Sequence, residues 1–214
     1  MVKLILVRHG ESEYNTKRCF TGHSNIALTS LGVRQAELTA RYLKDHFRVD
    51  AIYSSDLQRA YNTAVPFATA ADLPIHCDSA LRETNVGDWQ DRLYDDIVVE
   101  YPREIEAYHD RKLDFRFPNG ENSADVYARA SHALEQIAKR HDGETVAVFS
   151  HGGVIRTLCR KWMGLKPEQF HQAPLITNAS ITLASYNEGC AALLQISYDQ
   201  HLKELDSLKE IGVV

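Results

Sequence analysis

LILVRHGES, residues 4–12, decides how this chain folds, together with VAVFSHGG at residues 146–153. Each stretch is an apolar run of strand length that ends at a histidine followed by glycine. In an open α/β sheet, ligands bind where such strands end. Two imidazoles and a guanidinium at these ends therefore predict a site for an anion, and they favour phosphoryl transfer without a metal ion.

The composition predicts one large soluble domain with an anion site built locally. The chain has 214 residues, a formal net charge of −5 and 25% charged residues, which argues against a nucleic-acid surface or a polybasic membrane patch. Only four consecutive apolar residues precede Arg8, too few for a signal peptide or a spanning helix. The four cysteines are scattered, which argues against a zinc site and fits a reducing cytoplasm. We therefore expect a cytoplasmic protein with no metal and no cofactor.

The rest of the chain alternates strands with helices. Strands are predicted at residues 4–7, 51–54 and 145–149, with a closing pair at 180–186 and 191–198. Helices are predicted at residues 31–46, 125–140 and 152–163, and another runs through Ala70 with Ser55 or Asp56 as its N-cap. This order predicts an α/β three-layer sandwich with a mostly parallel central sheet and helices on both faces. Residues about 87–122 interrupt this alternation of strands and helices. We expect them to form a helical insertion over the active site within a single domain, 1–214.

Further motifs follow RHGES (8–12) in a fixed order over most of the chain. They are Asn15, FTG (20–22), LT (28–29), Gly32, QA (35–36), SSDLQRA (54–60), TA (63–64), LRE (81–83), Gly87, Trp89, PNGE (118–121), SHGG (150–153), Arg156 and NAS (178–180). Together they resemble the histidine phosphatase superfamily, which includes phosphoglycerate mutases and many small-molecule phosphatases. The order and spacing of the motifs carry this resemblance, because each is weak alone.

His9 is the predicted nucleophile. A neutral imidazole can attack phosphorus to give a phosphohistidine, which divides hydrolysis into two easier displacements. The other ring nitrogen should then donate to a backbone carbonyl that fixes the tautomer. A lone histidine at a strand end would more simply be structural, but Arg8 before it and Gly10 after it favour the catalytic role.

Arg8 and Arg59 are predicted to clamp the phosphoryl oxygens, because a planar guanidinium is always charged and matches their geometry. The matching arginines hold phosphate in the family that the chain resembles. The alternative for Arg59 is a solvated helix charge paired with Asp56, three residues earlier.

The same site should contain further donors. His151 is predicted to donate to a non-bridging oxygen as charge builds in the transition state, and Gly152 leaves room for a backbone amide to do likewise. Asn15 is predicted as a neutral donor. The resemblance places Thr21 and Gly22 at the border of the substrate.

Glu83 is the predicted proton carrier, which would protonate the leaving alkoxide and then deprotonate the attacking water. The alternative is a surface carboxylate that pairs locally with Arg82. The place of Glu83 before Gly87 and Trp89, in a chain that also carries His9, favours the catalytic role.

Three positions depart from the family pattern. Gln90 stands where relatives often have Gly, Asn25 where Asp is usual, and Asn122 where Ser often follows Gly-Glu. The run Thr84–Gly87 also lacks the Arg-His-Tyr-Gly sequence that follows the catalytic glutamate of phosphoglycerate mutases, whereas FTG at residues 20–22 is similar to theirs. These features bear on the substrate pocket rather than on the predicted phosphate cage.

The sequence therefore predicts a metal-independent phosphomonoesterase that hydrolyses small phosphorylated metabolites through a phosphohistidine on His9, with inorganic phosphate or sulfate able to occupy its site. Two alternatives stay open: a cofactor-dependent phosphoglycerate mutase, and a non-catalytic phospho-ligand binding protein on the same fold. No nucleic-acid or membrane partner is expected, and a homodimer is an open possibility.

Overall fold

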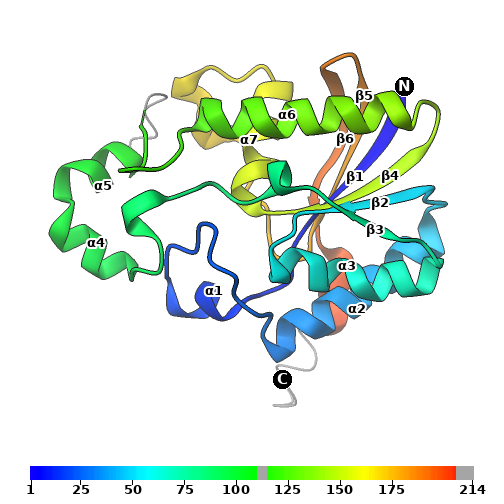
Figure 1. Ribbon diagram of the computed structural model, residues 1–214, viewed down its shortest axis with the longest axis horizontal. Helices are drawn as coiled ribbons and strands as arrows, with labels where there is room; N and C mark the ends of the chain where they lie inside the picture. Colours follow the sequence, from blue (N-terminus) through cyan, green and yellow to red (C-terminus); the bar gives the residue numbers. More distant parts are fainter. Residues whose placement is uncertain (110–114, 206–214) are drawn as a thin grey trace.

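A computed structural model describes residues 1–109 and 115–205 of the chain (Figure 1). The strands are β1 (Val2–Arg8), β2 (Ala51–Ser54), β3 (Ile75–Cys77), β4 (Thr145–Ser150), β5 (Ile181–Asn187) and β6 (Cys190–Tyr198). The helices are α1 (Glu13–Lys17), α2 (Ser30–His46), α3 (Gln58–Ala71), α4 (Tyr94–Glu100), α5 (Pro102–His109), α6 (Ser123–Arg140) and α7 (Gly152–Trp162). Short 3-10 turns lie at Ser79–Leu81, Gly87–Trp89, Pro167–Gln172 and Gln200–Leu202.

The described strands form one sheet in the order β3-β2-β4-β1-β5-β6. The first four are parallel to one another, and β5 and β6 join antiparallel to β1 and to each other. This arrangement confirms the predicted mostly parallel sheet, closed by an antiparallel pair. The carboxyl ends of β1, β2 and β4 consequently lie side by side at one edge of the sheet.

Helices cover both faces of the sheet, as Figure 1 shows. Successive side chains of β1 point to opposite faces, and on each face they are buried in an apolar core against helices. Leu4 and Leu6 pack with the apolar face of α6 and with α7, for example at Leu134. Ile5 and Val7 pack on the other face, with residues of α2 and α3. The predicted three-layer α/β architecture is therefore confirmed.

The described part of the insertion has a small core of its own. Val86, Trp89, Ile97, Ile105 and Phe117 are buried together, with aromatic rings packed around them. Figure 1 shows α4 and α5 together at one end of the molecule, near α1. Backbone hydrogen bonds between residues 18–20 and 91–94 join this segment to the loop after β1. The predicted helical character is confirmed, and residues 110–114 of the insertion lie outside the described residues.

The predicted N-cap of α3 is wrong. Helix α3 begins at Gln58 with Leu57 as its N-cap, and no side chain of the cap residue itself bonds the helix. The Gln58 amide donates to Oδ1 of Asn25 at 2.7 Å, and the Leu57 amide donates to Oγ of Ser55. Asn25 comes from a distant loop, so local sequence could not reveal this cap. Arg59 is therefore the second residue of α3.

A tight contact fixes α2 against the loop after β1. A Cβ atom at Gly32 would lie 2.0 Å from the carbonyl oxygen of Glu11, so only glycine allows this approach. The Thr29 hydroxyl accepts from the Gly32 amide at 3.0 Å and caps the helix. The loop that carries His9 thus rests directly on the start of α2. None of the described helices is long and apolar enough to cross a membrane.

Candidate active site

Strand register brings His9 and His151 together. β1 and β4 pair in parallel with Arg8 opposite Ser150, and the His9 amide donates to the Ser150 carbonyl at 3.0 Å. The two imidazole centroids are consequently 5.2 Å apart. Both side chains are buried, with 3% and 0% of their surfaces exposed.

The tautomer of His9 is set by the backbone. Its Nδ1 lies 2.7 Å from the Gly10 carbonyl oxygen, and a carbonyl only accepts, so Nδ1 carries the proton and Nε2 keeps its lone pair. Burial lowers the pKa of His9 well below its ordinary value, and the charges of Arg8 and Arg59 lower it further. His9 therefore has the neutral form that attack on phosphorus needs.

His151 is held by a serine that the sequence did not single out for this role. Its Nε2 lies 2.9 Å from Oγ of Ser55, which follows β2 directly. Within the described residues, no hydrogen-bond partner is present for its buried Nδ1 or for Nε of Arg8. Burial, followed by the charge of Arg59, lowers the pKa of His151 well below its ordinary value. The adjacency of β2 and β4 explains the contact, and only the sheet order could have revealed it.

Arg59 is a buried cation rather than a solvated helix charge. It is 1% exposed, and its guanidinium donates to the carbonyls of Gly22 at 2.9 Å and Ser24 at 2.8 Å. Burial lowers its pKa to about 10, against the attraction of Glu83, so it stays charged at neutral pH. The alternative pairing with Asp56 is wrong, because Asp56 binds Arg82 through two hydrogen bonds.

Glu83 is anchored at the N-terminus of α7. Its Oε2 accepts from the Gly153 amide at 3.1 Å, and its Oε1 accepts from the Thr84 amide at 2.8 Å. The alternative local pair with Arg82 is therefore also wrong. The charge of Glu83 acts on both Arg8 and Arg59 and raises their pKa values against the effect of burial. One carboxylate thus faces two guanidiniums.

A cavity of about 710 Å³ opens onto this cluster. Its lining includes five of the predicted site residues: Arg8, Thr21, Gly22, Glu83 and Gly152. His9, Arg59 and His151 are buried and do not line it, and neither does Asn15. Oδ1 of Asn15 accepts from the Ser12 amide at 3.0 Å and from Asn178 at 3.2 Å, so its role as a phosphate donor stays a prediction.

The comparisons with known proteins agree with this geometry. A family model described as the histidine phosphatase superfamily (branch 1) matches residues 4–199.

The chain belongs to the histidine phosphatase superfamily.

Similar members of the superfamily include a phosphoglycerate mutase-like protein and phosphoserine phosphatases. The chain is 32% identical over 210 residues to phosphoglycerate mutase-like protein 4 of Arabidopsis thaliana, covering 97% of this chain and 90% of that protein. It is 35% identical over 185 residues to a metal-independent phosphoserine phosphatase of the same plant, covering 86% and 76%. A mutant phosphoserine phosphatase of Entamoeba histolytica, solved with phosphoserine, has a TM-score of 0.82 at 28% identity and covers 94% of this chain and 100% of its own. The predicted family, fold class and enzyme class, a phosphoric monoester hydrolase, are confirmed.

The three departures from the family pattern each form a structural hydrogen bond. Asn25 caps α3 as described above, and Oε1 of Gln90 accepts from the His23 amide at 2.9 Å. Oδ1 of Asn122 accepts from the amides of Ala124 and Asp125 and caps α6. Only Asn122 lines the cavity. In this member of the superfamily, two of the three departures therefore act on the scaffold rather than on the pocket.

We expect both site imidazoles to be neutral in the free enzyme at pH 6. An ordinary histidine, with a pKa near 6.5, is mostly protonated at that pH, whereas the pKa values of His9 and His151 are lowered well below it. Two-dimensional ¹⁵N NMR of the imidazole rings should show His9 neutral and protonated on Nδ1. Signals from an imidazolium at His9 would contradict its predicted role as the nucleophile.

Gly153→Ala should separate activity from stability. A Cβ atom there would lie 2.4 Å from Oε1 of Glu83, so the carboxylate must move. Alanine is a better helix former than glycine, and Gly153 lies in α7, so the helix itself should not weaken. We expect turnover of alkyl phosphates to fall about tenfold or more, in line with loss of general acid–base help, while the melting temperature stays equal or rises. Full activity would show that the position of Glu83 is unimportant.

Proposed function

We propose that this protein hydrolyses small phosphomonoesters through a phosphohistidine on His9, with no metal ion in the reaction. The observation that carries the proposal is the neutral His9 imidazole, with Nδ1 held by the Gly10 carbonyl and with the charges of Arg8 and Arg59 acting on it. The guanidiniums supply the positive charge that a metal supplies in other phosphatases. The chain has a net charge of −5, so this positive potential is local to the site.

The first displacement forms the N–P bond and breaks the P–O bond of the ester. Nε2 of His9 attacks, and Glu83, which enters this step in its protonated form, gives that proton to the departing alkoxide. Arg8, Arg59 and Nδ1 of His151 would face the equatorial oxygens, whose charge they stabilise. The start of α7 at Gly152 adds backbone dipoles of the same sign.

The second displacement returns the enzyme to its starting state. Glu83, now a carboxylate, takes a proton from water, and the water attacks phosphorus while Nε2 of His9 leaves. The products are the alcohol and inorganic phosphate, and the proton on Glu83 is available for the next cycle. Phosphate and vanadate should therefore compete with the substrate.

Arg92 and Arg116 of the insertion do not supply the cations that a mutase would need, whereas Arg18, Arg156 and Arg160, outside the insertion, line the cavity. A mutase needs cations that hold a second anionic group, but Arg92 binds Glu100 and Arg116 binds Asp125. Neither arginine lines the cavity. Arg111 and Lys112 lie outside the described residues. Formation of 2-phosphoglycerate from 3-phosphoglycerate with a bisphosphate primer would instead support the mutase alternative.

The cavity favours a leaving group that carries an apolar ring. Its lining includes five aromatic side chains, those of Phe20, Tyr94, Tyr108, Phe115 and Phe117, together with the arginines Arg18, Arg156 and Arg160. Tyr108 is 37% exposed and Leu175, on the same lining, is 70% exposed. Apolar surface of this kind beside a polar reaction centre is typical of a pocket that orients the non-reacting part of a ligand.

His9→Ala should abolish turnover while the fold persists. On wild-type protein, an alkaline quench should trap phosphate that is stable to base and labile to acid, and mass spectrometry should place it on His9. Turnover should be unaffected by EDTA. His46→Ala is the matched control, because His46 is an exposed residue of α2. Substantial turnover by the His9 variant, or a requirement for an added divalent ion, would refute the proposed mechanism.

Tyr108→Ala should lower selectivity for ring-bearing esters. We expect the ratio of kcat/KM for 1-naphthyl phosphate to that for glycerol 2-phosphate to fall about tenfold, equal to about 1.4 kcal/mol of lost contact. Tyr61→Ala is the control, since Tyr61 on α3 is 39% exposed and does not line the cavity. A ratio unchanged by Tyr108→Ala would place ring recognition elsewhere.

A further inference from the structure

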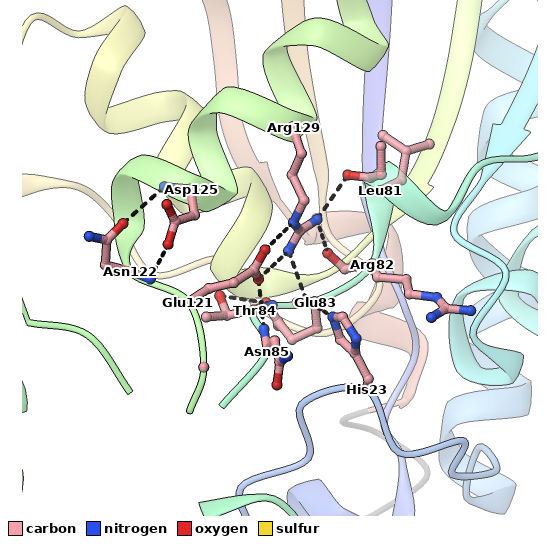
Figure 2. A network of polar contacts seen from close by, with 12 residues as sticks. His23, Leu81, Arg82, Glu83, Thr84, Asn85, Glu121, Asn122, Asp125 and Arg129 are labelled. Carbon is pink, nitrogen blue, oxygen red and sulfur yellow. Dashed lines mark hydrogen bonds and ion pairs between the residues drawn. The ribbon is translucent and has the colours of Figure 1, made fainter. Parts of the chain in front are cut away.

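A cluster outside the cavity lining converges on the segment that carries Glu83. Arg129 on α6 makes five hydrogen bonds with its guanidinium, which match its five N–H donors. Three of them go to backbone carbonyls: Ala80 at 2.8 Å, Arg82 at 2.7 Å and Glu83 at 2.9 Å. Figure 2 shows Arg129 extending from its helix between this segment and Glu121.

Glu121 completes the cluster from the other side. Its carboxylate accepts from Nε of Arg129 at 2.7 Å and from a terminal nitrogen of the same guanidinium at 2.9 Å. It also accepts from the Asn85 amide at 2.8 Å (Figure 2). The backbone is therefore held by Arg129 just before and at Glu83, and by Glu121 two residues after it.

The electrostatics show that the charge of Glu121 is stabilised by Arg129. Burial acts to raise the pKa of Glu121, but hydrogen bonds from Arg129 and from the Asn85 amide outweigh it and hold the pKa below its ordinary value. Each side chain of the pair is 20% exposed. A bidentate pair of this kind has a defined geometry as well as attraction, so it is suited to fixing a position.

We propose that the Glu121–Arg129 pair is a positioning device that holds Glu83 at the proton-transfer distance, an inference that rests on the proposed function. Neither residue lines the cavity, so the pair acts through the backbone rather than on the substrate. The Glu83 carbonyl also accepts from Nε2 of His23 at 2.8 Å, which adds a contact from the loop that borders the site. Misplacement of a catalytic group by about 1 Å can cost about 10²-fold in rate.

The test compares an ester that needs a proton for its leaving group with one that does not. Glycerol 2-phosphate releases a strongly basic alkoxide, whereas p-nitrophenolate leaves unaided. Rapid-quench measurements of phosphoenzyme formation on both esters should be made with Glu83→Gln, Arg129→Lys, Glu121→Gln and the double variant Glu83→Gln/Arg129→Lys. Lysine keeps the charge of Arg129 but has only three donors and no planar fork.

Arg129→Lys should slow phosphoenzyme formation from glycerol 2-phosphate about 10- to 100-fold and from p-nitrophenyl phosphate by less than about threefold. In the double variant, Arg129→Lys should slow phosphoenzyme formation little beyond the effect of Glu83→Gln alone, because the two changes act through the same proton transfer. Glu121→Gln should move both rates in the same directions by smaller factors, and it serves if the lysine variant does not fold. Arg92→Lys is the matched control, since Arg92 forms a two-bond pair with Glu100 away from this segment.

Two failures can be distinguished. If Glu83→Gln slows the two esters equally, Glu83 is not the general acid, and both the proposed role of Glu83 and this inference are overturned. If Glu83→Gln shows the leaving-group difference but Arg129→Lys slows both esters equally, or multiplies the loss in the double variant, only the positioning role is overturned. Melting temperatures of all variants separate either result from global unfolding.

Discussion

The parallel register of β1 and β4 is the constraint on which the candidate site depends. Arg8, the last residue of β1, lies opposite Ser150, the last residue of β4. The residue that follows each strand is a histidine, and the centroids of the two rings are therefore only 5.2 Å apart. Both strands have buried side chains on both faces, Ile5 and Val7 toward one core and Leu4 and Leu6 toward the other. A slip of one residue would exchange the faces of the whole strand. The apolar core therefore fixes the distance between the two imidazoles.

Burial determines the electrostatics of the site as much as its charges do. Arg59, His9 and His151 are buried and Arg8 is partly buried, and for all four burial is the largest cause that lowers the pKa. The arginines nevertheless remain charged, while the histidines become neutral. The site thus combines fixed cations with an uncharged His9 imidazole, the form that the proposed nucleophile needs. The pKa values of the two histidines are lower in the folded protein than in the unfolded chain. Below about pH 6.5 the unfolded chain therefore binds more protons than the folded protein, so acid lowers the free energy of unfolding.

The sequence could predict the features that depend on strand ends and on motif order. Apolar runs that stop at His9 and His151 were sufficient to place both rings at neighbouring strand ends. Pairings that depend on the sheet order were not predictable in this way. Ser55 contacts His151 because β2 lies beside β4, and Asn25 caps a helix that begins 33 residues later. Local sequence suggested pairs of neighbours, Asp56 with Arg59 and Arg82 with Glu83, whereas the fold instead joins Arg82 to Asp56 and leaves Arg59 and Glu83 for the site.

In the proposed mechanism, the position of Glu83 shows why this separation matters for proton transfer. In that role the carboxylate faces the charges of Arg8 and Arg59, while hydrogen bonds from backbone amides hold it in place. Its carboxylate accepts backbone amides from Thr84 and Gly153, and its main chain is held by Arg129. The charge of Arg129 is in turn matched by Glu121. The outer pair is neutral as a whole, so it can restrain the segment with its two charges largely balanced, although the charge of Arg129 still contributes to lowering the pKa of His151.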